Sequence, residues 1–196
     1  ELRGYFYDEG KFRSSTEAPA KLTVLRSNIQ ETKVKLEGKI ASHPFVQIIS
    51  IAQGEKRIDF DLTINWKKNV GIGEYKENSW RDNRRAYCDD RFKLSVLFPV
   101  NLHSPRIYKN APFDDTFFNS WDQIKHNIIL HWVDLAEQEG DYALALFADH
   151  TTSYSHGKDY PLGLTAQYSG NGLWGPDYKI TGPLKMKYAI VPHRGK

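Results

Sequence analysis

The fold of this chain is decided by the stretch Lys56-Arg57-Ile58-Asp59-Phe60-Asp61-Leu62-Thr63-Ile64-Asn65-Trp66. Apolar residues occupy every second position from Ile58 to Trp66, and polar residues fill the positions between them. Successive side chains of a β-strand point to opposite faces, so this period of two predicts a strand with one apolar and one polar face. The apolar face needs a second apolar layer, and the sequence offers more strands of this kind but no long amphipathic helix.

Alternating or continuously apolar segments predict the other strands. Lys21–Arg26 and Lys33–Ile40 suggest a hairpin, and the β-branched, almost wholly apolar Phe45–Ile51 suggests a central strand covered on both faces. Further strands are expected at Arg91–Phe98, Asn127–Leu135, Tyr142–Ala148, Pro161–Tyr168 and Leu184–Val191. About ten strands without a clear helix predict an all-β, antiparallel sandwich.

Polar and turn-rich segments separate these strands. We expect residues 1–20 to be an irregular lead-in that belongs to the same domain, and residues 21–196 to form a single β-sandwich domain. Irregular structure is also expected in Lys67–Asp90, Asn101–Trp121, Asp149–Tyr160 and the glycine-rich Ser169–Pro176. Long loops in compact domains are often functional or contact a partner.

Composition limits the class of protein. The 196 residues, 40% of them hydrophobic, suffice for one sizeable core. The net charge is only +3 and the basic residues are scattered, so no nucleic-acid partner is expected. No apolar run approaches the roughly 20 residues that span a bilayer, so no membrane partner is expected either. The single Cys88 cannot form an internal disulfide and leaves the cellular compartment undetermined.

Residue chemistry alone gives no active site. The seven histidines form no metal-binding motif, no Gly-x-Ser-x-Gly sequence occurs, and Cys88 has no recognisable partner. Carboxylate pairs such as Asp89-Asp90 and Asp114-Asp115 have the chemistry to act on a glycoside, but adjacent carboxylates in loops are more often solvated turn formers. We therefore expect neither a catalytic residue nor a metal site in this chain.

Aromatic and polar residues in the last third of the chain are the basis of a hypothesis of sugar contact. We expect exposed rings at Tyr154, Tyr160, Tyr168, Trp174 and Tyr178, close to Asp149, His150, Asn171 and Asp177. Sugars present apolar C–H faces ringed by hydroxyls, which aromatic rings and polar side chains satisfy together. The candidate substrate-binding residues are Asp149, His150, Tyr154 and Trp174. The alternative is that these aromatic rings pack in the core or at its rim.

Four blocks of sequence carry a further signal, namely Arg57–Trp66, Phe92–Pro99, Trp132–Leu135 with Gly140–Asp149, and Tyr188–His193. In this order they resemble the carboxy-terminal β region of glycoside hydrolase family 38 α-mannosidases. The resemblance covers most of the chain from about Leu22 onward, whereas the residues before Leu22 resemble nothing that we can assign. It implies a large antiparallel β supersandwich of the galactose mutarotase-like type, downstream of a catalytic domain.

The resemblance also implies where the chemistry lies. Enzymes of the family hydrolyse terminal α-D-mannosides with retention, using a carboxylate nucleophile and a zinc ion held by the amino-terminal catalytic domain. The sequence starts at Glu1 without that domain, and we interpret it as part of a longer polypeptide. No cofactor is expected in this fragment, zinc is expected in the missing domain, and the fragment alone is expected to be inactive. In the loop that corresponds to Leu146–Tyr154, Asp149 and Tyr154 match the family pattern but its Lys is not evident.

Three functional hypotheses follow. The first is a non-catalytic domain of an α-mannosidase that supports the catalytic domain of the same polypeptide and helps to line the sugar cleft, with mannose-containing glycans as further partners. The second is an independent carbohydrate-binding module. The third is a structural interaction domain without sugar contact. Titration calorimetry with mannose and mannobiose separates them, because only a module binds these sugars on its own.

Overall fold

The structure, a computed structural model, describes residues 1–6, 9–66, 90–118, 124–157, 160–169 and 180–194. The regular structure in these ranges is β-strand, apart from two short 3-10 turns at Ser15–Glu17 and Asp90–Phe92. These ranges contain no helix with the length and apolar character needed to cross a membrane. The prediction of an all-β, antiparallel fold is confirmed.

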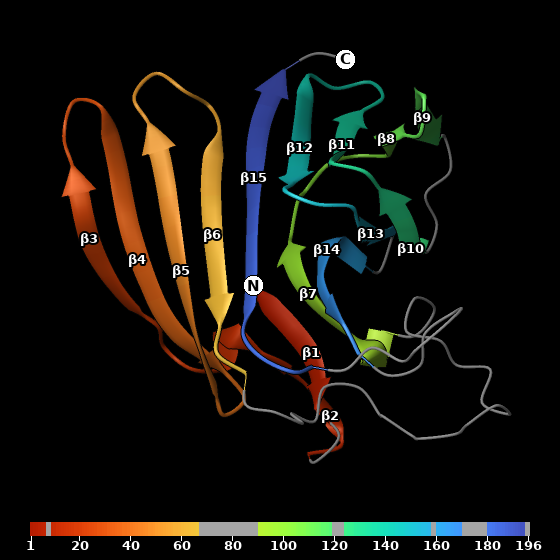
Figure 1. Cartoon of the computed structure of the whole chain (residues 1–196). Coiled ribbons are helices and arrows are strands. Elements are labelled where there is room, and N and C mark those ends of the chain that lie inside the picture. Colours follow the sequence, from red (N-terminus) through yellow and green to blue (C-terminus); the bar gives the residue numbers. More distant parts are fainter. Residues whose placement is uncertain (7–8, 67–89, 119–123, 158–159, 170–179, 195–196) are drawn as a thin grey trace, which may run out of the picture.

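The strands form two antiparallel sheets that share one core (Figure 1). The larger sheet has nine strands in the order β3 (Lys21–Ser27), β4 (Glu31–Ile40), β5 (His43–Ala52), β6 (Ile58–Ile64), β15 (Leu184–Arg194), β12 (Tyr142–Ala148), β11 (Trp132–Glu137), β8 (Pro105–Ala111) and β9 (Asp114–Phe118). The smaller sheet has six strands in the order β10 (Ile124–Ile129), β13 (Thr152–Gly157), β14 (Tyr160–Tyr168), β7 (Lys93–Phe98), β1 (Leu2–Phe6) and β2 (Lys11–Ser14).

The stretch around β6 behaves as its alternation predicts. Leu62, Ile64 and Trp66 are buried in the core between the sheets, whereas the side chains of Asp59 and Asp61 are about half exposed on the other face. The indole nitrogen of Trp66 donates a hydrogen bond to the side-chain oxygen of Gln167 in β14, 2.9 Å away. This bond ties the end of the β6 segment to the opposite sheet.

Strands β3 to β5 confirm one expectation and correct another. β3 and β4 form the predicted antiparallel hairpin, and β5 lies between β4 and β6 as a central strand should. The prediction that β5 is covered on both faces is wrong, because Phe45 is buried but Ile48 and Ile49 are half-buried and Ile51 is 39% exposed. In Figure 1, β3, β4 and β5 extend to one side of the smaller sheet, which leaves them partly uncovered.

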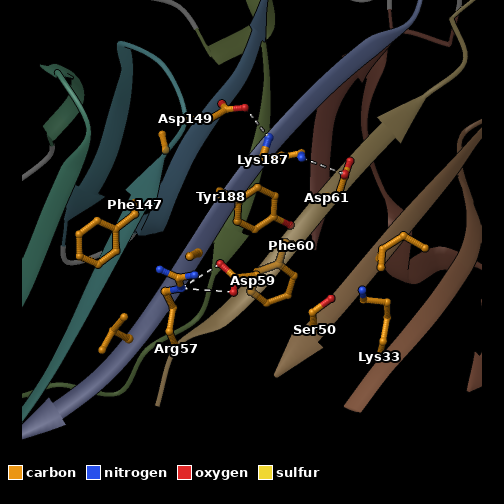
Figure 2. A pocket seen from close by; sticks show the side chains of 14 residues that line it. Lys33, Ser50, Arg57, Asp59, Phe60, Asp61, Phe147, Asp149, Lys187 and Tyr188 are labelled. Carbon is orange, nitrogen blue, oxygen red and sulfur yellow. Dashed lines mark hydrogen bonds and ion pairs between the residues drawn. The ribbon is translucent and has the colours of Figure 1, made fainter. Parts of the chain in front are cut away.

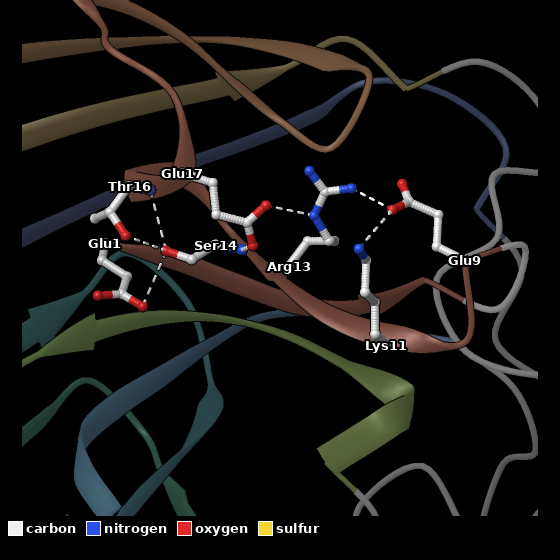
Figure 3. A network of polar contacts seen from close by, with 7 residues as sticks. All are labelled: Glu1, Glu9, Lys11, Arg13, Ser14, Thr16 and Glu17. Carbon is white, nitrogen blue, oxygen red and sulfur yellow. Dashed lines mark hydrogen bonds and ion pairs between the residues drawn. The ribbon is translucent and has the colours of Figure 1, made fainter.

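The prediction of an irregular lead-in over residues 1–20 is also wrong. β1 and β2 form a hairpin, and β1 pairs antiparallel with β7, so the lead-in is part of the smaller sheet. A polar network holds the end of this hairpin (Figure 3). Ser14 caps the 3-10 turn together with Glu17, and the Arg13 guanidinium bonds to Glu17 at 2.5 Å and also to Glu9.

Three more segments differ from the sequence-based expectation. Asn101–Trp121 contains β8 and β9, and Asp149–Tyr160 contains β13. The single strand expected over Asn127–Leu135 is two strands, because the chain leaves the smaller sheet after β10 and joins the larger sheet as β11. The loop predicted for Lys67–Asp90, except Asp90 itself, and residues 170–176 of the predicted glycine-rich loop lie outside the described residues.

Candidate functional site

A groove of about 610 Å³ runs over the outer face of the larger sheet, where β4, β5, β6, β15 and β12 lie side by side (Figure 2). The strand register places its lining residues in rows, since residues that oppose one another on neighbouring strands share a face. One row is Lys33, Ser50, Asp59, Ala189 and Phe147, one residue from each strand. The groove is therefore a direct product of the polar face that the sequence predicts for β6.

Charges of opposite sign alternate across this face. Asp59 is paired with Arg57 at 3.0 Å, and Asp61 is paired with Lys187 on the neighbouring strand β15 at 3.8 Å. Both pairs are exposed, with about half of each carboxylate side chain and more of each cation open to solvent. Exposed pairs of this kind are worth only about 0–1 kcal/mol, so a ligand can replace them at little cost.

Phe147 gives the groove an apolar surface beside these charges. Phe147 is 37% exposed, and it lies in the same row as Asp59, with Ala189 of β15 between them. Carboxylates accept hydrogen bonds, Lys and Arg donate them, and an aromatic ring covers an apolar face. The groove thus combines the groups that bind a sugar, or any other hydroxylated ligand with one apolar face.

Asp149 and His150 lie at the edge of this groove, in the turn between β12 and β13. Asp149 lines the groove, and one of its carboxylate oxygens accepts a hydrogen bond from the backbone N–H of Lys187 at 3.0 Å. The other oxygen lies 2.6 Å from Nδ1 of His150. Both side chains are close to half exposed. The structure therefore brings these two predicted residues together at an accessible position.

Tyr154 is not at the surface, which corrects the expectation of an exposed ring there. Its side chain has no exposed area, and it lies in β13 between Leu164 of β14 and Asn127 of β10. Burial raises the pKa of its hydroxyl, an effect that the adjacent Asn127 side chain partly offsets. Among the other aromatic residues predicted to be exposed, Tyr168 is half-buried and hydrogen-bonded to Ser153. Trp174 and Tyr178 lie outside the described residues.

Burial of Tyr154 agrees with the alternative that these rings pack in the core. The segment was expected to be a loop because β13 is rich in hydroxyl side chains. These hydroxyls are satisfied inside the sheet: Thr152 Oγ1 donates to the carbonyl oxygen of Thr165 at 2.6 Å, and Ser153 Oγ donates to Thr165 Oγ1 at 2.8 Å. Buried polar groups that are bonded in this way do not oppose burial.

The groove residues Arg57, Phe147 and Lys187 were not among the candidates predicted from the sequence. Asp59 and Asp61 could be recognised as part of the polar face of β6. The neighbouring strand β15, which supplies Lys187, lies more than 100 residues away in the sequence. Within the described ranges, no group of three or more His, Cys, Asp or Glu side chains is placed to hold a metal ion.

The comparison with protein-family models identifies the family, and two solved structures share the fold. The model of the glycosyl hydrolases family 38 C-terminal domain matches residues 5–165, so the match includes part of the lead-in that resembled nothing assignable. The structure is similar to an alpha-mannosidase from Enterococcus faecalis V583, with a TM-score of 0.66 and 12% identity over 98% of this chain and 25% of that chain. It is also similar to a glycosyl hydrolase family 38 protein from Enterococcus faecalis, with a TM-score of 0.65 and 13% identity over 98% of this chain and 26% of that chain.

The similarity to the solved structures concerns the fold and one part of their chains. At 12–13% identity, similarity to the solved structures shows the fold alone. This chain spans about a quarter of the length of the two solved chains. A search of curated proteins gave no match.

Proposed function

This chain belongs to the family of glycosyl hydrolase family 38 C-terminal domains, and from that premise we propose that it is the non-catalytic β-sandwich of an α-mannosidase. In the intact enzyme it supports the catalytic domain of the same polypeptide and lines one side of the sugar cleft. The observation that carries the proposal is the family match over residues 5–165. The zinc ion and the carboxylate nucleophile that the family resemblance implies are assigned to the catalytic domain.

The shape of the domain supports a scaffolding role. A sheet of nine strands is a rigid base, and it holds the Asp149-His150 turn at a fixed place beside the groove. Rigid elements position loop residues more accurately than loops do on their own. The turn is therefore the part of the described chain that we expect nearest to the sugar cleft.

Turnover of a chromogenic α-mannoside tests this proposal. We expect no turnover by this chain alone, turnover by the intact polypeptide, and loss of turnover or of thermal stability when residues 1–196 are removed from it. Activity of this chain alone that survives repeated purification and a chelator would contradict the non-catalytic assignment. Full activity and an unchanged Tm after removal of residues 1–196 would contradict the supporting role.

The groove favours a second candidate function, an independent carbohydrate-binding module. Phe147 beside Asp59, with Asp149 at the groove edge, offers a ring and carboxylates at one accessible surface. Titration calorimetry with mannose and mannobiose separates the two functions. Millimolar or tighter binding that weakens in Phe147→Ala, and not in the matched control Phe113→Ala, supports the module; Phe113 is fully exposed and does not line the groove. If neither sugar gives a binding heat, the supporting role in the intact enzyme is favoured over the module.

A further inference from the structure

A second hollow, of about 560 Å³, lies on the inner face of the larger sheet where the two sheets separate. We call it the inner trough. Its floor is formed by residues of β4, β5, β6, β15 and β12. Its wall is formed by the start of β1, by residues between Ser15 and Ala20, and by the end of β7 with Pro99 and Val100. The lining is mainly apolar and includes Leu36, Phe60, Phe98, Val100, Leu144 and Ile190. The trough and the outer groove share only Phe60 and Tyr188 among their lining residues.

Exposure along one cross-strand row shows how this face is left open. The row runs from Val24 through Val34, Ile49 and Phe60 to Tyr188. Val24 is 58% exposed, the next three are half-buried, and Tyr188 is only 4% exposed. Leu22, in the adjacent row beside Leu36, is 59% exposed. The apolar inner face therefore continues from the trough onto β4 and β3, beyond the cover of the smaller sheet.

The polar groups on the trough floor are already bonded to each other. The side-chain nitrogen of Gln47 donates to the hydroxyl of Tyr188, and the Tyr188 ring is held by Phe60 and Phe98. A polar or charged occupant would find few free partners there and would lose its hydration. The floor thus fits apolar side chains.

The first residue of the chain indicates which segment can reach the trough. The amine of Glu1 donates to the carbonyl oxygen of Leu97 at 3.0 Å, and the N–H of Leu97 donates to the carbonyl oxygen of Glu1 at 2.7 Å. This pair continues the ladder between β1 and β7, and Glu1 itself lines the trough. A residue before Glu1 in a longer polypeptide would oppose Phe98, and the one before that would oppose Pro99.

Pro99 sets the length of that continuation. Its nitrogen carries no hydrogen, so it cannot supply the next ladder bond, and pairing with β7 ends within about two residues of Glu1. The chain would leave β7 between Phe98 and Val100, both of which line the trough.

We propose that the segment that precedes Glu1 in the intact polypeptide covers the inner trough and packs apolar side chains on β4 and β3. This inference rests on the proposed function, in which a catalytic domain on the same polypeptide precedes this chain. The segment, rather than the folded catalytic domain, would then close the sandwich. The outer groove stays open to a ligand or to the rest of the enzyme.

Photo-crosslinking on the intact polypeptide tests the proposal. A benzoylphenylalanine in place of Leu22 should crosslink to the residues that precede Glu1, as identified by mass spectrometry of the joined peptides. The same crosslinker in place of Thr23, whose side chain points to the opposite face of β3, should not crosslink to them. Crosslinks from position 22 to a second copy, to a distant segment, or to nothing would each overturn the proposal.

A pair of substitutions in the intact polypeptide gives an independent readout. Val24→Asn and Thr23→Asn replace β-branched residues on the same strand with the same side chain, so their effects on strand propensity are matched. We expect Val24→Asn to lower Tm more than Thr23→Asn does, by about 2–4 °C. Equal shifts, or the reverse order, would overturn the proposal. Mannosidase activity of the unmodified polypeptide is measured in parallel: activity without crosslinks refutes only the trough proposal, and crosslinks without activity refute only the proposed function.

Discussion

Tyr188 of β15 stacks on Phe60 of the neighbouring strand β6, with ring centroids 4.8 Å apart and ring planes at 12°. The same tyrosine ring meets Phe98 of the opposite sheet edge-on, at 5.8 Å and 79°. Tyr188 therefore joins the two sheets at the floor of the inner trough. Aromatic pairs of this geometry contribute about 0.5–1.5 kcal/mol beyond the area that they bury.

Removing the Phe60 ring should destabilise the domain strongly. We expect Phe60→Ala to lower the free energy of unfolding by about 2–4 kcal/mol, because it leaves a cavity against Tyr188 and removes the stacking contact. Phe113→Ala is the control, since Phe113 is fully exposed and its loss should change stability by less than about 0.5 kcal/mol. Urea unfolding measures both. Equal losses in the two variants would show that the stacked pair does not contribute.

Two buried tyrosines should make the domain sensitive to high pH. Burial raises the pKa of Tyr188 and of Tyr154, with smaller opposite effects from Gln47 and Asn127. The folded chain therefore keeps protons that the unfolded chain releases near pH 10, so this stability is fully present below about pH 10 and is lost as the pH rises toward the folded pKa values. The slope is at most about 1.4 kcal/mol per pH unit for each group.

Phenolate absorbance near 295 nm, followed with unfolding by circular dichroism, measures this effect. We expect part of the tyrosine absorbance to rise only together with unfolding, and Tyr188→Phe to remove a share of that late rise. A single smooth titration of all tyrosines in the folded state would contradict the assignment.

Gly38 should not tolerate a side chain. It opposes Phe45 across β4 and β5, and a Cβ atom on Gly38 would lie 2.6 Å from Cζ of the Phe45 ring. Phe45 is buried, so its ring cannot move aside freely. Gly38→Ala should cost about 1–3 kcal/mol in unfolding free energy. Gly182→Ala is the matched control, because a Cβ atom at Gly182 would have no other atom within 4 Å. Thermal unfolding should show a lower Tm only for Gly38→Ala.

Strands whose pattern is local were predictable from sequence, and β6 and the β3–β4 hairpin are the clearest cases. β1 was not, because its partner β7 lies about 90 residues away in the sequence. β13 was not, because its buried hydroxyl groups bond across the sheet. For β1 a distant strand partner, and for β13 hydrogen bonds to the neighbouring strand, allow burial that local composition does not indicate.

The candidate site divides in the same way. Asp149 and His150 could be named because they are polar residues of a sugar-binding type next to aromatic residues in the sequence, and the structure shows their side chains in contact. The outer groove could not be named, because it exists only where Asp59 of β6 meets Ala189 of β15 and Phe147 of β12. Alternation gives the face of a residue, but only the strand order gives its neighbours.

Asp149 and Asp61 both interact with Lys187, but in different ways. Replacing each should show how much more a hydrogen bond to the backbone contributes to stability than an exposed ion pair does. Asp149 accepts a hydrogen bond from the Lys187 backbone N–H at 3.0 Å and returns one from its own N–H to the Lys187 carbonyl oxygen at 3.1 Å. Asp61 meets only the exposed Lys187 amine, at 3.8 Å. We expect Asp149→Ala to cost about 1 kcal/mol and Asp61→Ala less than about 0.5 kcal/mol, although both remove one negative charge. Urea unfolding measures the two losses of stability. Hydrogen exchange of the Lys187 amide should become faster only in Asp149→Ala. Equal exchange rates in both variants would show that the Asp149 carboxylate does not hold the turn.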